Sequence, residues 1–311
     1  MNSTHSANTP HTIQIQLSEA SAPKTLVYYS NDAEALNNNE DCLLFLHGIL
    51  GDGRTWIPYF DQFPQMKTVS LTQSGFGSLG SFDQNNDEDN DSEDSETLFD
   101  TAIHAQELSA FCKALNQQDQ TPNRKFRIVA WSYACHVALL AAQENPELFK
   151  SLTLYELIVP SYGMTEEDQA LFTQDLTKMM SPIIKAYRRN QPEKAMDHFI
   201  SACKNAPYSL SEQAETIQSI KQDNAQSLQK LLTQKEPKAI SKKALLAIDQ
   251  SVPITILVGE NSRGIFQLSS KSAANSLNKT LQIIPNADHL LPEEMPEVFG
   301  KVLKDILNEA L

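Results

Sequence analysis

Residues 126–143 read FRIVAWSYACHVALLAAQ, and a serine stands where one apolar pattern gives way to another. Phe126–Trp131 is an almost continuous apolar run, which suits a strand covered on both faces of a sheet. Along Tyr133–Asn145 apolar residues recur three and four positions apart, as on one face of a helix, and Pro146 follows where that helix should end. The sequence therefore predicts a strand, a tight turn at Ser132 and a helix.

Seven further stretches have the pattern of short strands. The first two alternate polar and apolar residues, as an antiparallel strand at a sheet edge would. Helical patterns at Thr101–Leu115 and Pro292–Leu307 lie among the later strands, and such alternation is typical of a mostly parallel sheet flanked by helices. We therefore predict an α/β fold with eight strands. Besides Phe126–Trp131 they are Thr12–Leu17, Thr25–Tyr29, Cys42–Leu46, Lys67–Thr72, Ser151–Tyr155, Ile254–Val258 and Leu281–Ile284.

Strand patterns are missing between Pro160 and about Ala244. Helix-compatible segments take their place, at residues 166–187, 192–204 and 211–232. We predict that residues 161–244 form a helical insertion after the sixth strand. Residues 1–160 and 245–311 would then form the core.

Composition and charge narrow the class of protein. Hydrophobic residues make up 41% of the 311 residues and charged residues 21%, as in ordinary globular proteins. The formal net charge is −14, whereas a nucleic acid or an anionic membrane requires a basic face, so we expect neither as a partner.

Much of the negative charge is local. The run Asp83–Thr97 holds eight acidic residues and no basic one, which leaves −6 for the rest of the chain, and we interpret it as a solvated loop. Its alternating aspartates resemble the start of a calcium loop, but Ser92 and Leu98 stand where such a loop needs glycine and glutamate. We therefore expect no metal there.

Cysteine usage and the N-terminus bear on location. The four cysteines are widely spaced and form no CxxC pair, so we expect free thiols in a reducing compartment. The first twenty residues lack a basic segment followed by an apolar one, and no window holds about 18 consecutive apolar residues. These features predict a cytoplasmic protein.

Ser132 is a candidate nucleophile. A serine hydroxyl reacts only beside a base, and a tight strand-to-helix turn with small neighbours leaves it accessible to one. Here Ala130 and Ala134 are those small neighbours. By itself this pattern is also that of a serine capping a helix.

Two further segments favour the interpretation of Ser132 as a nucleophile over that of a helix cap. The apolar strand Cys42–Leu46 ends in His47-Gly48-Ile49-Leu50-Gly51-Asp52-Gly53, a turn able to direct backbone N–H groups at an oxyanion. We assign the amides of Ile49 and Tyr133 to that hole and give His47 a structural role. Gly48 and Trp131 are expected to line the substrate pocket, with core packing as the alternative for Trp131.

The second segment holds the base. His289 follows the strand at Leu281–Ile284 on a loop before the last helix, where we expect it to accept the serine proton. A carboxylate should orient this histidine, and Glu156 and Glu260 each follow a strand in the chain order serine, acid, histidine.

With these segments in order, the chain resembles the α/β-hydrolase superfamily from Cys42 to the final helix. The matching segments are LHGILGDGRTW, SGFGS, HAQELSAFCKAL, VAWSYACHVALL, LTLYE, ILVGENS and IPNADHLLPEEMPE. The resemblance implies a helical cap after the sixth strand and an active site between cap and sheet, at the carboxyl ends of the strands.

The chain departs from the family pattern at two places. Members usually have glycine where Ala130, Ala134 and Cys135 stand, and an aspartate where Ser262 stands. A bacterial subgroup with a Tyr-Glu segment after strand six and Gly-Glu-x-Ser after strand seven is similar to this chain. That resemblance favours Glu156 as the acid over Glu260.

We therefore predict a serine hydrolase that cleaves an ester-like or activated carbonyl bond of a small molecule through an acyl-enzyme, without metal or organic cofactor. Carbon–carbon bond hydrolysis, or cofactor-free lyase or oxygenase chemistry, is the alternative within enzymes. A catalytically weak ligand-binding protein of the same fold is the other alternative. A homodimer is left open.

Overall fold

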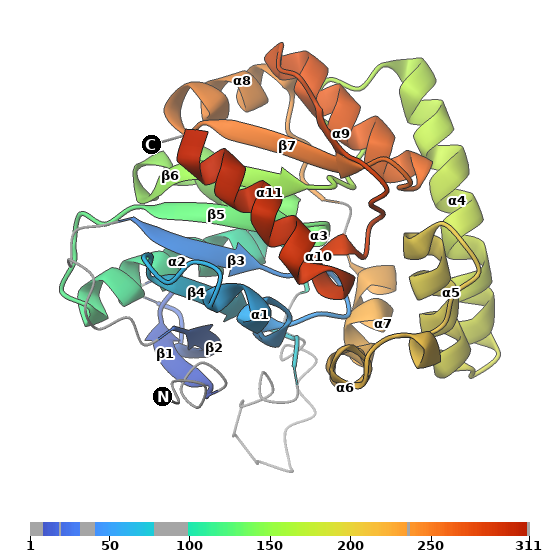
Figure 1. Ribbon diagram of the computed structural model, residues 1–311, viewed down its shortest axis with the longest axis horizontal. Coiled ribbons are helices and arrows are strands. Elements are labelled where there is room, and N and C mark those ends of the chain that lie inside the picture. Colours follow the sequence, from blue (N-terminus) through green and yellow to red (C-terminus); the bar gives the residue numbers. More distant parts are fainter. Residues whose placement is uncertain (1–8, 19, 32–40, 78–98, 235–236, 310–311) are drawn as a thin grey trace.

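The computed structural model describes residues 9–18, 20–31, 41–77, 99–234 and 237–309 of the chain, so the acidic run at 83–97 lies outside the described residues. Its centre is one eight-stranded sheet with the order β1-β2-β4-β3-β5-β6-β7-β8 (Figure 1). Strands β1 and β2 pair antiparallel to their neighbours, and the other pairs are parallel. The predicted eight-stranded, mostly parallel sheet is confirmed. The strands are β1 (His11–Ile15), β2 (Lys24–Ser30), β3 (Cys42–Leu46), β4 (Thr68–Thr72), β5 (Phe126–Trp131), β6 (Phe149–Tyr155), β7 (Ile254–Gly259) and β8 (Gln282–Ile284).

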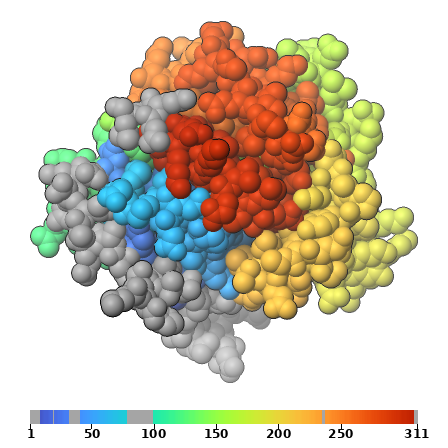
Figure 2. Space-filling view, in the orientation of Figure 1, coloured from blue at the N-terminus to red at the C-terminus, as the bar shows by residue number. Residues whose placement is uncertain are grey.

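The central strands are apolar on both faces because helices cover both. On β3 and β5, Leu44 and Ile128 face one apolar layer, while Phe45 and Val129 face the other. The first layer is completed by α2 (Thr101–Gln118), α3 (Tyr133–Glu144), α8 (Lys242–Ser251) and α9 (Gly264–Leu277). The second is completed by η1 (Gly53–Trp56), α1 (Ile57–Phe60), α10 (Leu291–Glu294) and α11 (Pro296–Glu309). Figure 2 shows α11 in red across the middle of this second face.

Among the described residues between β6 and β7 there is no strand, and the helices before α8 are gathered at one end of the sheet in Figure 1. They are α4 (Glu166–Arg188), α5 (Pro192–Lys204), η3 (Leu210–Glu212), α6 (Glu215–Asp223) and α7 (Ala225–Thr233). Side chains from this segment, among them Phe172, Met179 and Leu228, belong to the same buried cluster as the first sheet layer. The division into a core and a cap of residues 161–244 stays a prediction. Helix α8 begins inside that range, at Lys242, and packs on α3 and α9.

Two predicted helices are divided in the structure. The helix expected at 292–307 is interrupted at Met295 because Pro296 has no amide hydrogen to continue it. The helical stretch at 211–232 becomes η3, α6 and α7, and the break between the last two falls at Asn224. Contacts of Asn224 with the core, described below, account for that break.

Candidate active site

Ser132 lies on the turn between β5 and α3 in a strained backbone conformation. Its φ of 59° and ψ of −120° are rare for a residue with a side chain, and such strain is characteristic of functional sites. Its amide donates a hydrogen bond to the Tyr155 carbonyl at 2.9 Å, which fixes the turn to β6. The structure therefore places the predicted nucleophile on the expected strand-to-helix turn.

Cys135 occupies a position where glycine was expected, and its contacts explain how it fits. The side chain is fully buried, and its thiol lies 3.3 Å from the carbonyl oxygens of both Ala130 and Tyr155. A thiol is small and is a weak hydrogen-bond donor. Cys135 thus fills the space beneath the turn and contacts the two strands that carry it.

Gly48 packs directly against Ser132. A Cβ atom on Gly48 would lie 3.1 Å from Ser132 Cβ, which is a tight contact, and 3.7 Å from Ser132 Oγ, so a larger residue would press on the side chain of Ser132. Gly48 also begins a β-turn that the Gly51 amide closes at 3.2 Å. Within the described part of the chain, the amides of Ile49 and Tyr133 donate none of the observed hydrogen bonds, so both are free to bind an oxyanion.

His47 maintains the shape of this turn. Its Nδ1–H donates to the Gly48 carbonyl at 2.9 Å, and its Nε2 accepts the Gln73 amide at 3.1 Å. Burial lowers the pKa of His47 to about 4, so the ring is neutral at physiological pH. These contacts fit the structural role predicted for His47.

His289 lies on the loop between β8 and α10 and is 3% exposed. Its ring stacks on Phe266, with 3.8 Å between ring centroids and an interplanar angle of 9°. Its Nδ1 lies 2.6 Å from Glu156 Oε2, and a hydrogen bond to a carboxylate places the ring proton on Nδ1. Nε2 is then left to accept a proton.

Glu156 follows β6 and is fully buried. Its Oε1 accepts hydrogen bonds from the Gly259 amide, at 2.8 Å, and from the Ser262 hydroxyl. Together with His289, these donors satisfy a carboxylate that water cannot reach. Ser262 stands where an aspartate was expected from the resemblance, and here it contacts the acid from β6.

The structure does not bring the alternative acid to His289. Glu260 is exposed, and its Oε2 accepts the amide of Asn286 at 2.9 Å. Between the two carboxylates, the described geometry joins only Glu156 to His289.

Trp131 is buried in one of the two apolar layers of the sheet. Its side chain is 2% exposed and belongs to the apolar layer under α11, where its ring contacts Trp56 at 6.5 Å and His289 at 5.5 Å between centroids. Ala130 and Trp131 are neighbours on a strand and therefore point to opposite faces. The burial of Trp131 fits the core-packing alternative, and Gly48 lies beside Ser132. The assignment of either residue to a substrate pocket stays a prediction.

The side chain of Tyr133 is also held in place. Its hydroxyl donates to His104 Nδ1 at 2.9 Å, because His104 Nε2 must donate to the Ser74 carbonyl at 3.0 Å. Burial lowers the pKa of His104. His104 thus holds the side chain of Tyr133, the residue that follows Ser132 on the turn. The sequence pattern of α2 did not predict this role for His104.

Further residues, which were not predicted from the sequence, hold the loop that carries His289. The Tyr155 hydroxyl donates to the Asp288 carbonyl at 2.5 Å, next to His289. Lys204 of α5 pairs with the Asp288 carboxylate at 3.0 Å, and Lys221 of α6 forms a buried ion pair with Glu293 at 2.8 Å. The helices between β6 and β7 thus contact the loop that carries His289.

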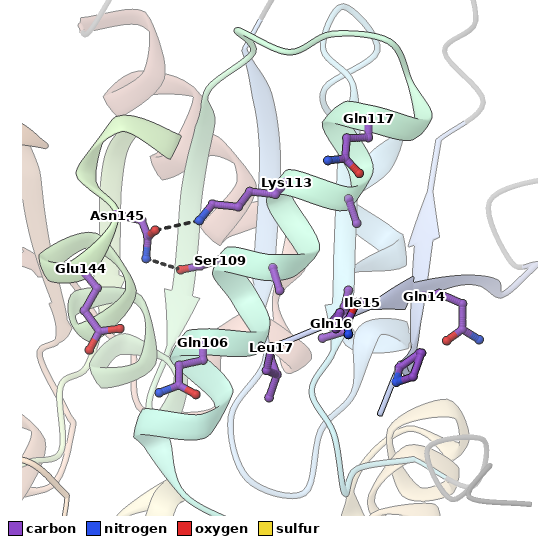
Figure 3. A pocket seen from close by; sticks show the side chains of 13 residues that line it. Gln14, Ile15, Gln16, Leu17, Gln106, Ser109, Lys113, Gln117, Glu144 and Asn145 are labelled. Atoms are coloured by element: carbon purple, nitrogen blue, oxygen red, sulfur yellow. Dashed lines mark hydrogen bonds between the residues drawn. The ribbon is translucent and has the colours of Figure 1, made fainter. Parts of the chain in front are cut away.

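Other features of the described residues lie apart from this site. No three His, Cys, Asp or Glu side chains converge as a metal site among them. A surface groove between β1 and α2 is lined by polar side chains such as Gln14, Lys113 and Asn145, and none of the predicted site residues lines it (Figure 3). Within the same described ranges, no helix has both the length and the apolar character needed to cross a lipid bilayer.

Comparison with protein families gives one match over most of the chain. The model described as "Alpha/beta hydrolase family" matches residues 43–302, from β3 into α11. A search of curated proteins finds no sequence that matches the chain.

Solved structures share the whole fold at low sequence identity. An esterase from Thermogutta terrifontis is 18% identical with a TM-score of 0.65, over 96% of this chain and 99% of the esterase. A putative lipase from Acinetobacter baumannii AYE is 17% identical with a TM-score of 0.66, over 97% and 92%. MenH from S. aureus is 20% identical with a TM-score of 0.63, over 91% and 98%. The TM-scores show that these proteins share a fold with this chain. Sequence identities this low leave the activity open.

Proposed function

Because the chain belongs to the alpha/beta hydrolase family, we propose that it is a serine hydrolase in which Ser132 attacks a carbonyl carbon and His289 is the base. The proposal is supported by two observations, the strained turn that carries Ser132 and the buried Glu156–His289 pair. A purely structural histidine would not need a buried carboxylate that leaves its second nitrogen unprotonated.

The mechanism follows from the proton positions. His289 Nε2 takes the proton of Ser132 as the hydroxyl attacks an ester carbonyl, and the imidazolium that forms is stabilised by Glu156. The amides of Ile49 and Tyr133 stabilise the oxyanion. His289 then gives its proton to the departing alcohol. In the second step His289 removes a proton from water as it attacks the acyl-enzyme and returns that proton to Ser132 as the acid leaves.

The burial of the reacting groups bears on the substrate. Ser132 is 6% exposed and His289 is 3% exposed, so we propose a small acyl group that can reach a nearly enclosed hydroxyl. The esterase and the putative lipase of the same fold make an ester the first substrate class to test. A cytoplasmic location, a cap of residues 161–244 and a homodimer stay predictions.

A fluorophosphonate probe followed by peptide mapping tests the nucleophile, since the probe reacts only with an activated serine. We expect stoichiometric label on Ser132 at neutral pH, and none in the Ser132→Ala variant. A second incubation after denaturation shows whether the label depends on the folded site. If folded wild-type protein shows no label on Ser132, the nucleophile assignment is wrong, and a ligand-binding protein becomes the better description.

A further inference from the structure

The turn that carries the Ile49 amide has an unusual residue in it. Leu50 is the third residue of the β-turn that Gly48 begins and Gly51 closes, and its φ is 64°. That position of a β-turn normally takes glycine when φ is positive, because a side chain is strained there. The orientation of the peptide between Ile49 and Leu50 must therefore be stabilised by contacts from outside the turn.

Ser227, in the first turn of α7, supplies such a contact. Its hydroxyl accepts the Leu50 amide at 3.1 Å and donates to the Asn224 carbonyl at 2.7 Å, so both of its hydrogen-bonding roles are used. The side chain is fully buried, and no water competes for these bonds. The Leu50 N–H belongs to the peptide that follows Ile49, so this bond fixes the plane of that peptide.

Asn224 holds the α6–α7 junction against the core. Its side-chain nitrogen donates to Asp52 at 2.7 Å, and its side-chain oxygen accepts the Gly77 amide at 2.6 Å. Asp52 in turn caps η1 through the Arg54 amide, and Arg54 pairs with Asp223 at 2.8 Å. The position of Ser227 over the turn is thus set by a network of buried and partly buried polar contacts.

We propose that Ser227 is a positioning residue for the oxyanion hole, holding the Ile49 amide in place through the Leu50 peptide. The inference rests on the proposed serine-hydrolase function. Ser227 does not touch the substrate, and it orients a donor that matters most when the carbonyl oxygen becomes charged. Its loss should therefore weaken transition-state stabilisation more than binding of the ester.

The test compares Ser227→Ala and Ser227→Cys with a matched control, Ser276→Ala. Ser276 is also a buried serine, on α9, and its hydroxyl donates to the carbonyl of Tyr162, another residue with positive φ. For a short-chain aryl ester we expect kcat to fall roughly 10-fold or more in both Ser227 variants, with KM within about twofold of wild type. Affinity for a trifluoromethyl ketone, whose serine adduct carries an oxyanion, should fall by a similar factor. The Ser276 variant should keep wild-type kcat and wild-type ketone affinity.

The outcomes separate this inference from the proposed function. Wild-type kcat and ketone affinity in the Ser227 variants would overturn it, and so would a loss confined to KM or an equal loss in Ser276→Ala. If Ser227→Ala does not fold, Ser227→Cys decides, because cysteine fills the space but accepts hydrogen bonds weakly. Wild-type protein without label on Ser132 refutes the serine-hydrolase function and this inference with it. Labelled wild-type protein with unaffected Ser227 variants refutes the inference alone.

Discussion

Replacing Glu156 by glutamine should abolish most turnover, because the new amide would reverse the proton arrangement of His289. Oε1 of the carboxylate accepts bonds from the Gly259 amide and the Ser262 hydroxyl, while Oε2 faces His289 Nδ1 at 2.6 Å. Glutamine has the same shape, and the two donors select its carbonyl oxygen for the Oε1 place. Its NH₂ group then faces Nδ1, which must accept, so the ring proton moves to Nε2. That nitrogen could no longer take the proton of Ser132.

Where a triad carboxylate is replaced by its amide, turnover falls about 10,000-fold, which is about 5.5 kcal/mol of transition-state stabilisation. We expect kcat of Glu156→Gln on a short-chain aryl ester to fall by roughly 1,000- to 10,000-fold. Glu260→Gln is the matched control and should keep wild-type kcat, because its exposed side chain only accepts the Asn286 amide, which a glutamine oxygen can also do. Near-ultraviolet circular dichroism checks that both variants are folded. Full activity in a folded Glu156→Gln protein would refute the assignment, and so would a loss seen only in the control.

Three other outcomes are expected. Burial lowers the pKa values of His47 and His136 to about 4, so the unfolded chain binds more protons than the folded one between about pH 6.5 and 4. The free energy of unfolding, measured in urea, should therefore fall as pH drops through that window, by about 3 kcal/mol for each histidine, and a flat profile would contradict the neutral buried rings. Gly48→Ala should lower kcat by roughly 10-fold or more in a folded protein, because its Cβ would lie 3.1 Å from Ser132 Cβ; unchanged kcat would show that the space beside the hydroxyl is not needed. All four cysteines are free and buried, and burial raises the pKa of Cys42 to about 12, so a thiol reagent should titrate four groups only after denaturation.

The parts of the site that follow from neighbouring residues could be predicted from the sequence. A strand, a small-residue turn and a helix identify Ser132, because the geometry of that turn depends on residues within a few positions of it. The side on which Trp131 lies could not be predicted in this way. Alternation shows that Ala130 and Trp131 point to opposite faces, but both faces are apolar, and only the tertiary fold decides which of the two buried layers holds Trp131.

The helix break at Asn224 shows a second limit. The stretch 211–232 contains neither glycine nor proline, so local propensity favours one continuous helix. In the structure the Asn224 side chain bonds to Asp52 and Gly77, which are about 170 and 150 positions away in the chain. Contacts over such separations override the local preference for a continuous helix, and no local sequence pattern predicts them.

The choice of acid depends on the same kind of distant contact. A carboxylate at position 262 would lie against the Glu156 carboxylate, because the Ser262 hydroxyl already donates to Oε1 there. Two adjacent buried carboxylates cannot both be charged without a large energetic cost, so an acid at one position favours a neutral donor at the other. Serine at 262 and glutamate at 156 are therefore two parts of one arrangement. In place of the expected aspartate, the chain has a hydroxyl that donates to the Glu156 oxygen that does not face His289.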